Sequence, residues 1–244
     1  MAPSRPTPRL YLITPPVAEP AAFAPQLEAA LGAGDVAAVL LRLAAADERT
    51  LINRTKILAE TVQRRDVALL VDNRPGIVAR AGADGAHLSG IDAFAAALAL
   101  LKPDRIAGAG GLSSRHDAML AAETGADYVM FGEPPPYPPP QAGEGSHHFP
   151  PPRAGEGQGG GPRRRMPFDD ILERLTWWAE LFEIPCVGYA ASRDEVAPLA
   201  QTGADFIALG EWIWTEPQNT AATIAAAAQQ LASAPVQAGE GDHP

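Results

Sequence analysis

The chain has 244 residues, which suits one large α/β domain or two small ones and is enough to bury a substantial core. Its net charge of −10 argues against a nucleic-acid binder or an anionic-membrane binder, because both need an excess of positive charge. A single cysteine, Cys186, excludes an internal disulfide and a cysteine-rich metal site. With no signal peptide and no apolar run of membrane-spanning length, these features predict a soluble cytoplasmic protein.

Short apolar runs rich in strand-forming residues recur along the chain. In chain order, we predict strands at Leu10–Thr14, 36–41, Val67–Asp72, 85–88, Arg105–Ala109, 128–132, Ile184–Tyr189 and 206–210. Four of them follow a Gly-Asp or Gly-Ala-Asp phrase, which starts at Gly34, Gly82, Gly125 and Gly203. Glycine commonly ends a helix, so each phrase marks a helix-to-strand joint.

Amphipathic stretches of helical length lie between these strands, notably Asp47–Arg65 and Phe168–Glu183. Ser114–Asp117 and Ser192–Glu195 have the pattern of capping boxes that open helices. Eight strands alternating with helices predict a parallel sheet, and that many units close most economically into a single (βα)8 TIM barrel over residues 9–234. The alternative, an open doubly wound sheet, usually has fewer strands and a Gly-rich dinucleotide turn after the first, where this chain has Thr14-Pro15-Pro16.

A low-complexity segment interrupts this rhythm between residues 133 and 167. Pro and Gly fill 18 of its 35 positions, too few apolar side chains remain to offset the entropy of ordering it, and we predict a disordered insertion after the sixth strand. The tails, 1–8 and 235–244, are also predicted to be disordered. His147-His148 and Arg163–Arg165 are accordingly interpreted as solvated and mobile, rather than as a metal site and a phosphate-binding patch.

In a TIM barrel, functional residues lie at the carboxyl ends of the strands. Read in chain order, those ends resemble the thiamine phosphate synthase family, from Leu10–Thr14 to Trp214, and belong with a superfamily that includes thiazole tautomerases. The most specific stretch runs from Asp72-Asn73-Arg74 through Gly82–Leu88 to Asp92.

The resemblance implies that hydroxymethylpyrimidine diphosphate is joined to a thiazole phosphate, giving thiamine phosphate and pyrophosphate. It implies phosphorylated small-molecule substrates and Mg2+, which neutralises the leaving group. By resemblance the metal carboxylates are Asp92 and Asp72. The implied substrate-binding positions are Arg42, Asn73, Arg74, His87, Gly132, Gly188, Gly210 and Glu211. No catalytic residue is assigned, and the sequence leaves open whether the protein is a homo-oligomer.

Several positions depart from the family pattern. The strand-2 motif Gln-Leu-Arg-x-Lys keeps only Leu41 and Arg42, and Asn-Asp-Arg after strand 3 is permuted to Asp72-Asn73-Arg74. The Gly-Gly after strand 7 is Ala190-Ala191, and the phosphate-binding Ser after strand 8 is Glu211, whose charge would repel a phosphate. The strand-5 His that the tautomerases use is Leu112, so that activity is not favoured.

These departures leave alternatives open. Asp92 is expected either to cap the helix 93–101 or to bind metal, and His87 to be either a buried structural residue or a ligand contact. Arg42 and Arg74 would bind phosphate or form salt bridges with Asp72 or Asp92. Besides a synthase of full or weakened activity, the sequence allows a non-catalytic or repurposed barrel that binds a thiamine-related or other small ligand, or a barrel enzyme suited to the acidic pair Glu133 and Glu211.

Overall fold

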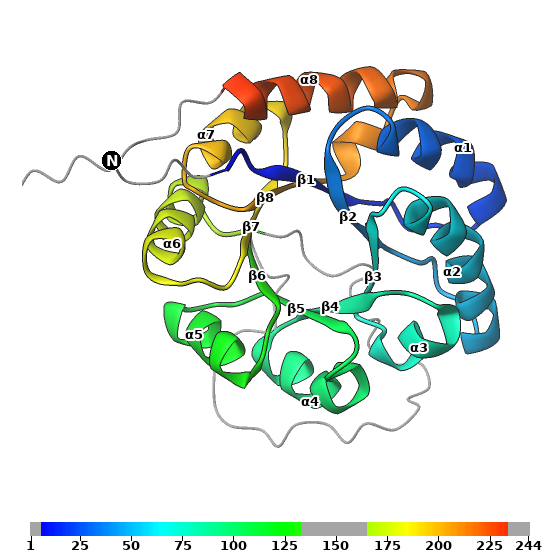
Figure 1. Ribbon diagram of the computed structural model, residues 1–244, viewed down its shortest axis with the longest axis horizontal. Helices are drawn as coiled ribbons and strands as arrows, with labels where there is room; N and C mark the ends of the chain where they lie inside the picture. Colours follow the sequence, from blue (N-terminus) through cyan, green and yellow to red (C-terminus); the bar gives the residue numbers. More distant parts are fainter. Residues whose placement is uncertain (1–5, 133–164, 234–244) are drawn as a thin grey trace, which may run out of the picture.

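The structure is a computed structural model that describes residues 6–132 and 165–233. Eight parallel strands close into a barrel in chain order, and β1 pairs with β8 to complete the ring (Figure 1). The strands are β1 Arg9–Ile13, β2 Val36–Leu41, β3 Ala68–Asp72, β4 Gly85–Ser89, β5 Ile106–Gly110, β6 Tyr128–Phe131, β7 Cys186–Ala190 and β8 Phe206–Leu209. The predicted TIM barrel is confirmed, with strand ends displaced by two residues at most.

The helices form an outer ring around these strands (Figure 1). They are α1 Pro20–Leu31, α2 Glu48–Gln63, α3 Val78–Ala81, α4 Ile91–Leu101, α5 Arg115–Thr124, α6 Phe168–Leu181, α7 Val196–Ala200 and α8 Thr220–Ser233. Short 3-10 helices add η1 Pro75–Ile77, η2 Arg193–Glu195, η3 Glu211–Trp214 and η4 Pro217–Asn219. In the part of the chain that the structure describes, no helix combines the length and the apolarity needed to cross a membrane.

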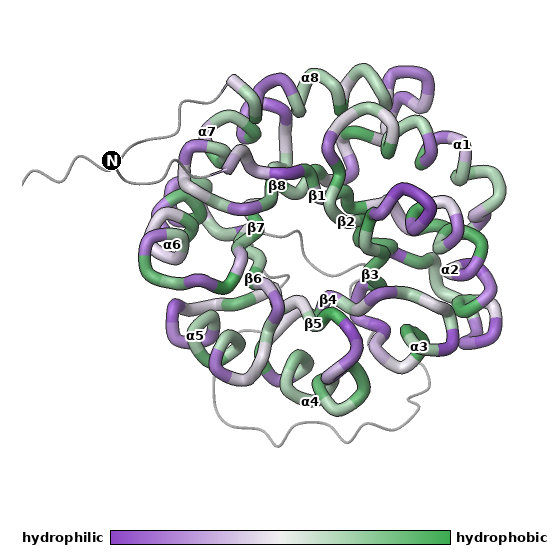
Figure 2. Tube along the Cα trace, in the orientation of Figure 1, coloured by the Kyte–Doolittle hydropathy of each residue, from purple (hydrophilic) through white to green (hydrophobic). Residues whose placement is uncertain are grey.

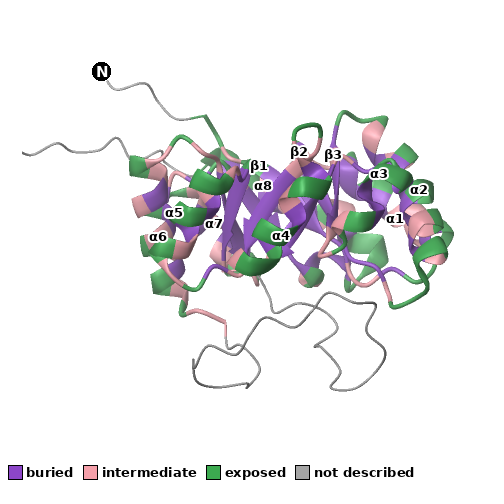
Figure 3. Cartoon of the chain, turned by 90° about the horizontal axis from the view of Figure 1, so that it is seen from below, coloured by how far each residue is buried: buried purple, intermediate pink, exposed green. Residues whose placement is uncertain are grey.

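Side chains alternate along each strand between the barrel lumen and the surrounding helices. The lumen cluster consists of Tyr11, Ile13, Ala38, Leu40, Leu70, Tyr128, Met130, Val187, Tyr189 and Ala208. The residues between them pack outward against the helices and form a larger apolar cluster. The strands are therefore buried on both faces, whereas the helices expose their outer, more hydrophilic faces (Figures 2 and 3).

Two of the predicted helix features are confirmed. Ser114 accepts a hydrogen bond from the Asp117 amide, and the Asp117 carboxylate accepts one from the Ser114 amide, which completes a capping box at the start of α5. Helix α6 buries Ile171, Leu175 and Trp178 on one face, as its spacing predicts. The apolar stripe explains why a helix forms directly after the low-complexity segment.

The predicted insertion needs a correction at its carboxyl end. The disorder predicted for 1–8, 133–167 and 235–244 falls mostly outside the described residues, as do His147-His148 and Glu133. Residues 165–167 are part of the fold, however, because Met166 packs against the outer core and Pro167 occupies the N-cap position of α6. Composition alone could not show where the chain rejoins the barrel.

Candidate active site at the barrel mouth

Four polar side chains at the carboxyl ends of β8, β2 and β3 form a continuous string across the barrel mouth. Arg42, after β2, lies between two carboxylates, with its Nε 3.3 Å from Asp72 Oδ2 and its Nη1 3.6 Å from Glu211 Oε1. Asn73 Nδ2 donates a hydrogen bond of 2.9 Å to the other oxygen of Asp72. The string joins the ends of β8, β2 and β3, so three predicted site residues far apart in sequence meet as expected.

The strand period accounts for this meeting. Leu40 and Leu70 face the lumen, so Arg42 and Asp72, two residues further along β2 and β3, face it too. Both side chains are almost fully buried, with 6% and 8% of their surfaces exposed. The permuted order Asp72-Asn73 thus does not turn the carboxylate away from the mouth. Both Asp72 oxygens are engaged by described residues, one by Arg42 and one by Asn73.

Asn73 connects this string to a pocket beside it. The residue adopts a left-handed backbone conformation with φ 50°, which Asn tolerates better than most residues. Its side-chain oxygen accepts a hydrogen bond from the Ser89 amide, which ties β3 to the end of β4. The neighbouring pocket, of about 740 Å³, is lined by Asn73, Ser89, Gly90, Asp92, Gly111 and Ser113 among others, and lies at the carboxyl ends of β3, β4 and β5.

Asp92 lies in the first turn of α4 and lines this pocket. The predicted cap is wrong, because α4 begins at Ile91 after Gly90 and receives no side-chain cap. The Asp92 carboxylate is exposed and accepts no hydrogen bond from any residue that the structure describes. Among those residues, no group of three or more His, Cys, Asp or Glu side chains is placed to hold a metal. A site built from Asp92 still fits Mg2+, which commonly takes one or two protein carboxylates and completes its shell with substrate phosphates and water.

His87 is a buried member of a hydrogen-bonded chain inside the lumen. Its Nδ1 lies 2.9 Å from the Tyr128 hydroxyl, which in turn lies 2.9 Å from the Tyr11 hydroxyl. The three side chains come from β4, β6 and β1, and His87 is only 1% exposed. The geometry favours the buried, structural alternative for His87. The chain of polar groups forms the floor below the mouth.

Tyr189 fills the lumen at the end of β7. Its hydroxyl lies over Gly210, so close that a Cβ added there would come within 2.2 Å of it. Burial raises the pKa of the phenol, and the charges of Arg42 and Arg165 oppose that rise. Gly210 is therefore required for packing under an aromatic ring. The family pattern gave no signal for this ring.

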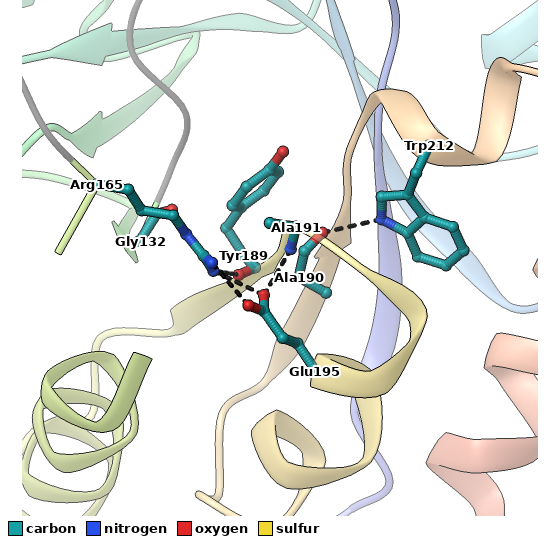
Figure 4. A network of polar contacts seen from close by, with 7 residues as sticks. All are labelled: Gly132, Arg165, Tyr189, Ala190, Ala191, Glu195 and Trp212. Atoms are coloured by element: carbon teal, nitrogen blue, oxygen red, sulfur yellow. Dashed lines mark hydrogen bonds and ion pairs between the residues drawn. The ribbon is translucent and has the colours of Figure 1, made fainter. Parts of the chain in front are cut away.

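An ion pair ties the ends of β6 and β7 together beside the mouth (Figure 4). Arg165 contacts Glu195 through both terminal nitrogens at 2.7 Å and donates to the carbonyls of Tyr189 and Gly132. The interpretation of Arg165 as a solvated residue is wrong, because the side chain is largely enclosed by these acceptors. Glu195 also accepts the Ala191 amide at 2.7 Å.

This arrangement replaces the capping box predicted at Ser192–Glu195. Ser192 occupies the N-cap position of η2, but its side chain makes no cap hydrogen bond. The Glu195 carboxylate accepts a hydrogen bond from the Ala191 amide instead of the Ser192 amide, and its other contacts are with Arg165. The strong charged partner, supplied from a distant part of the chain, explains why the local motif does not form.

Three further predicted site residues, Arg74, Gly132 and Gly188, lie outside the string of polar side chains. Arg74 is exposed and forms no ion pair with a described residue. Gly188 faces the helices, since a Cβ there would meet Leu175 and Leu199, and Gly132 lies against Ile171. At both positions a glycine leaves room for neighbouring apolar side chains.

The two tryptophans after β8 act as packing residues. Trp212 donates to the Ala190 carbonyl and Trp214 to the Ile13 carbonyl, so the loop after β8 is fastened to β7 on one side and to β1 on the other. The buried, free Cys186 lies in β7 as expected. The backbone after β8 is thus anchored on both sides, while the side chain of Glu211 itself is 56% exposed.

Comparison with known proteins agrees with this architecture. The model of the family described as thiamine monophosphate synthase matches residues 10–137, more than half of the chain. The thiamine-phosphate synthase of Rhodospirillum centenum is 41% identical over 89% of this chain and 94% of its own, and that of Hyphomonas neptunium is 36% identical over 91% and 93%. A thiamine phosphate pyrophosphorylase structure from Pyrococcus furiosus shares the fold, with a TM-score of 0.66 at 22% identity over 92% of this chain and 95% of that one. With its barrel, its ordered strand-end residues and its full-length relatives in agreement, the chain belongs to the thiamine monophosphate synthase family.

Proposed function

We propose that this protein is a thiamine-phosphate synthase, a transferase that joins hydroxymethylpyrimidine diphosphate to thiazole phosphate and releases pyrophosphate. The main support is the 41% identity to a thiamine-phosphate synthase over 94% of that protein's length. The barrel mouth supports it independently, because it offers one buried guanidinium, Arg42, linked through Asp72 and Asn73 to a pocket large enough for a small organic substrate. We propose that the protein acts in the cytoplasm.

The chemistry assigned to the mouth is the separation of pyrophosphate from the pyrimidine, followed by attack of the thiazole nitrogen on the resulting carbocation-like carbon. Arg42 binds the negative charge that develops on the departing pyrophosphate, and burial strengthens that interaction. Asp72 holds the Arg42 guanidinium in position, while Asn73 fixes Asp72 and the end of β4. Asp92 would hold Mg2+, and that ion would neutralise part of the pyrophosphate charge.

The experiment is a direct assay of the purified full-length chain. Both substrates are mixed with Mg2+, and thiamine phosphate is measured by its conversion to fluorescent thiochrome phosphate. Product formation that depends on both substrates is expected, with strong loss in Arg42→Gln. No product above the no-enzyme background would reject the proposal.

A second candidate function rests on the carboxylates near the mouth. Glu211 and Glu195 lie at the ends of β8 and β7, where barrels of this type frequently bind phosphate. A barrel that binds a thiamine-related ligand without turnover would show a rise in melting temperature with that ligand and no product. Melting curves that stay flat with both substrates and with thiamine phosphate would eliminate this candidate.

A further inference from the structure

Arg42 is a buried cation whose hydrogen-bonding capacity is not fully used. Only 6% of its side chain is exposed, and Asp72 Oδ2 lies 3.3 Å from its Nε. The pair is close but poorly aligned, so Nε has no hydrogen-bond partner among the described residues. Buried donors of this kind are rare, because a donor removed from water loses its partners there. Asp72 therefore does not fully satisfy the Arg42 guanidinium, whose Nη1 lies toward a second carboxylate, that of Glu211.

Glu211 is the second carboxylate beside Arg42, and it lies at Nη1 rather than at Nε. Its Oε1 lies 3.6 Å from Arg42 Nη1, beyond normal hydrogen-bond length, and 56% of its side chain is exposed. Glu195 provides the contrast, since it contacts Arg165 twice at 2.7 Å, accepts the Ala191 amide, and is only 17% exposed. Of the two carboxylates at the ends of β7 and β8, one is fixed and the other is loosely held.

The charges around Arg42 determine what that loose contact does. Asp72 already balances the single positive charge, so Glu211 adds an excess negative charge beside it. An incoming phosphate needs the Arg42 face that Glu211 occupies, and at such short range like charges repel strongly even near a protein surface. Binding of an anion therefore requires Glu211 to turn away toward solvent, which its exposure permits.

We propose that Glu211 is a displaceable internal anion that competes with the anionic group of the substrate for Arg42. It thereby lowers the affinity of the mouth for organic diphosphates and sets which charged ligands are retained. The identity of the natural diphosphate rests on the proposed function, whereas the competition itself concerns only Arg42, Glu211 and any diphosphate. Release of pyrophosphate is assisted in the same way, because Glu211 returns to Arg42 as the product leaves.

The test is the affinity of the full-length protein for inorganic pyrophosphate, measured by isothermal titration calorimetry without turnover. Glu211→Gln removes the charge and keeps the shape, and we expect it to bind pyrophosphate about tenfold more tightly than the unchanged protein. The matched control is Glu216→Gln, an exposed carboxylate five residues further along that contacts Asn219 rather than an arginine. The control is expected to leave the affinity unchanged, which separates competition at Arg42 from a general change in surface charge.

Each outcome decides the matter. Tighter binding in Glu211→Gln alone supports the competition, including the case in which the unchanged protein shows no detectable binding. Equal or weaker binding in Glu211→Gln, equal gains in both variants, or no binding by any of the three proteins would overturn it. The double variant Arg42→Gln/Glu211→Gln should lose the gain, with its circular dichroism spectrum confirming the fold. A synthase that works normally but shows no gain refutes only this inference, and a gain in a protein without synthase activity refutes only the proposed function.

Discussion

Arg165 and Glu195 meet through two contacts of 2.7 Å, although all of α6 and β7 lie between them along the chain. Arg165 is the first described residue after the low-complexity segment. The pair therefore fixes the point at which the chain rejoins the barrel. This point lies beside Tyr189, whose backbone carbonyl accepts a hydrogen bond from Arg165.

The first prediction concerns the stability of this ion pair. Arg165→Ala and Glu195→Ala should each lower the free energy of unfolding by about 2 kcal/mol, because each leaves a partly buried charge without its partner. In a double-mutant cycle the coupling between them should be about 1–2 kcal/mol in urea denaturation. The exposed pair Arg65 and Glu28, 3.7 Å apart, serves as control and should show less than about 1 kcal/mol. A coupling near zero for Arg165 and Glu195 would mean that the contacts do not hold the segment.

The second prediction concerns the space under Tyr189. Gly210→Ala should destabilise the fold by about 1–3 kcal/mol, because the new methyl group overlaps the phenol and forces the ring to move. Gly76→Ala is the control, since no atom lies within 4 Å of a Cβ at that position. Adding Tyr189→Leu to Gly210→Ala should restore part of the lost stability, measured by urea denaturation. Equal stability of Gly210→Ala and Gly76→Ala would show that the ring is not held there.

The third prediction is a dependence of the α5 cap on pH. Hydrogen bonds from the Ser113 and Ser114 hydroxyls and amides lower the pKa of Asp117, against the opposing effect of burial. Its folded-state pKa lies below the unfolded value, so the stabilisation is present above the unfolded pKa and is lost as pH falls through the folded one. Asp117→Asn should cost about 1 kcal/mol at pH 7, and the difference should be smaller in acid, at a pH below the ordinary Asp pKa of 3.8. Urea denaturation at both pH values measures it. A stability difference that stayed undiminished in strong acid would show that the Asp117 carboxylate is not its source. The exposed Asp104→Asn variant should show no stability difference at either pH.

The fourth prediction tests the metal role assigned to Asp92. Asp92→Asn should raise the Mg2+ concentration for half-maximal synthase activity on the order of tenfold, because the amide is a weaker ligand for this ion. The free energy of unfolding should not fall, since the carboxylate accepts no hydrogen bond from a described residue. An unchanged Mg2+ requirement would remove Asp92 from the metal site. Asp104→Asn again supplies a control for the loss of one exposed carboxylate.

The sequence predicted the barrel well because its signals are local. Each of the eight strands has an apolar run of its own, and four of them follow a glycine-containing joint, so many separate observations agree on one architecture. The meeting of Arg42, Asp72 and Glu211 followed from that architecture, since parallel strands of a closed ring end at one face.

The unpredicted features all depend on partners that are distant in the chain. Arg165 looked like part of a solvated basic run, and only the position of Glu195 shows that it is bound. Ser192 had the local pattern of a cap, but Glu195 turns to a different partner. The chain from His87 through Tyr128 to Tyr11 joins three strands across the lumen, and no pattern along one strand indicates it.

The pairing of β1 with β8 has a consequence for folding during synthesis. Leu10 and Leu12 pair in register with Ile207 and Leu209, and Trp214 donates a hydrogen bond to the Ile13 carbonyl. During synthesis one edge of β1 therefore stays unpaired until β8, residues 206–209, has left the ribosome. Such late, long-range closure slows folding and leaves nascent chains open to aggregation. A chain that terminates before β8 cannot close the barrel and leaves one edge of β1 unpaired.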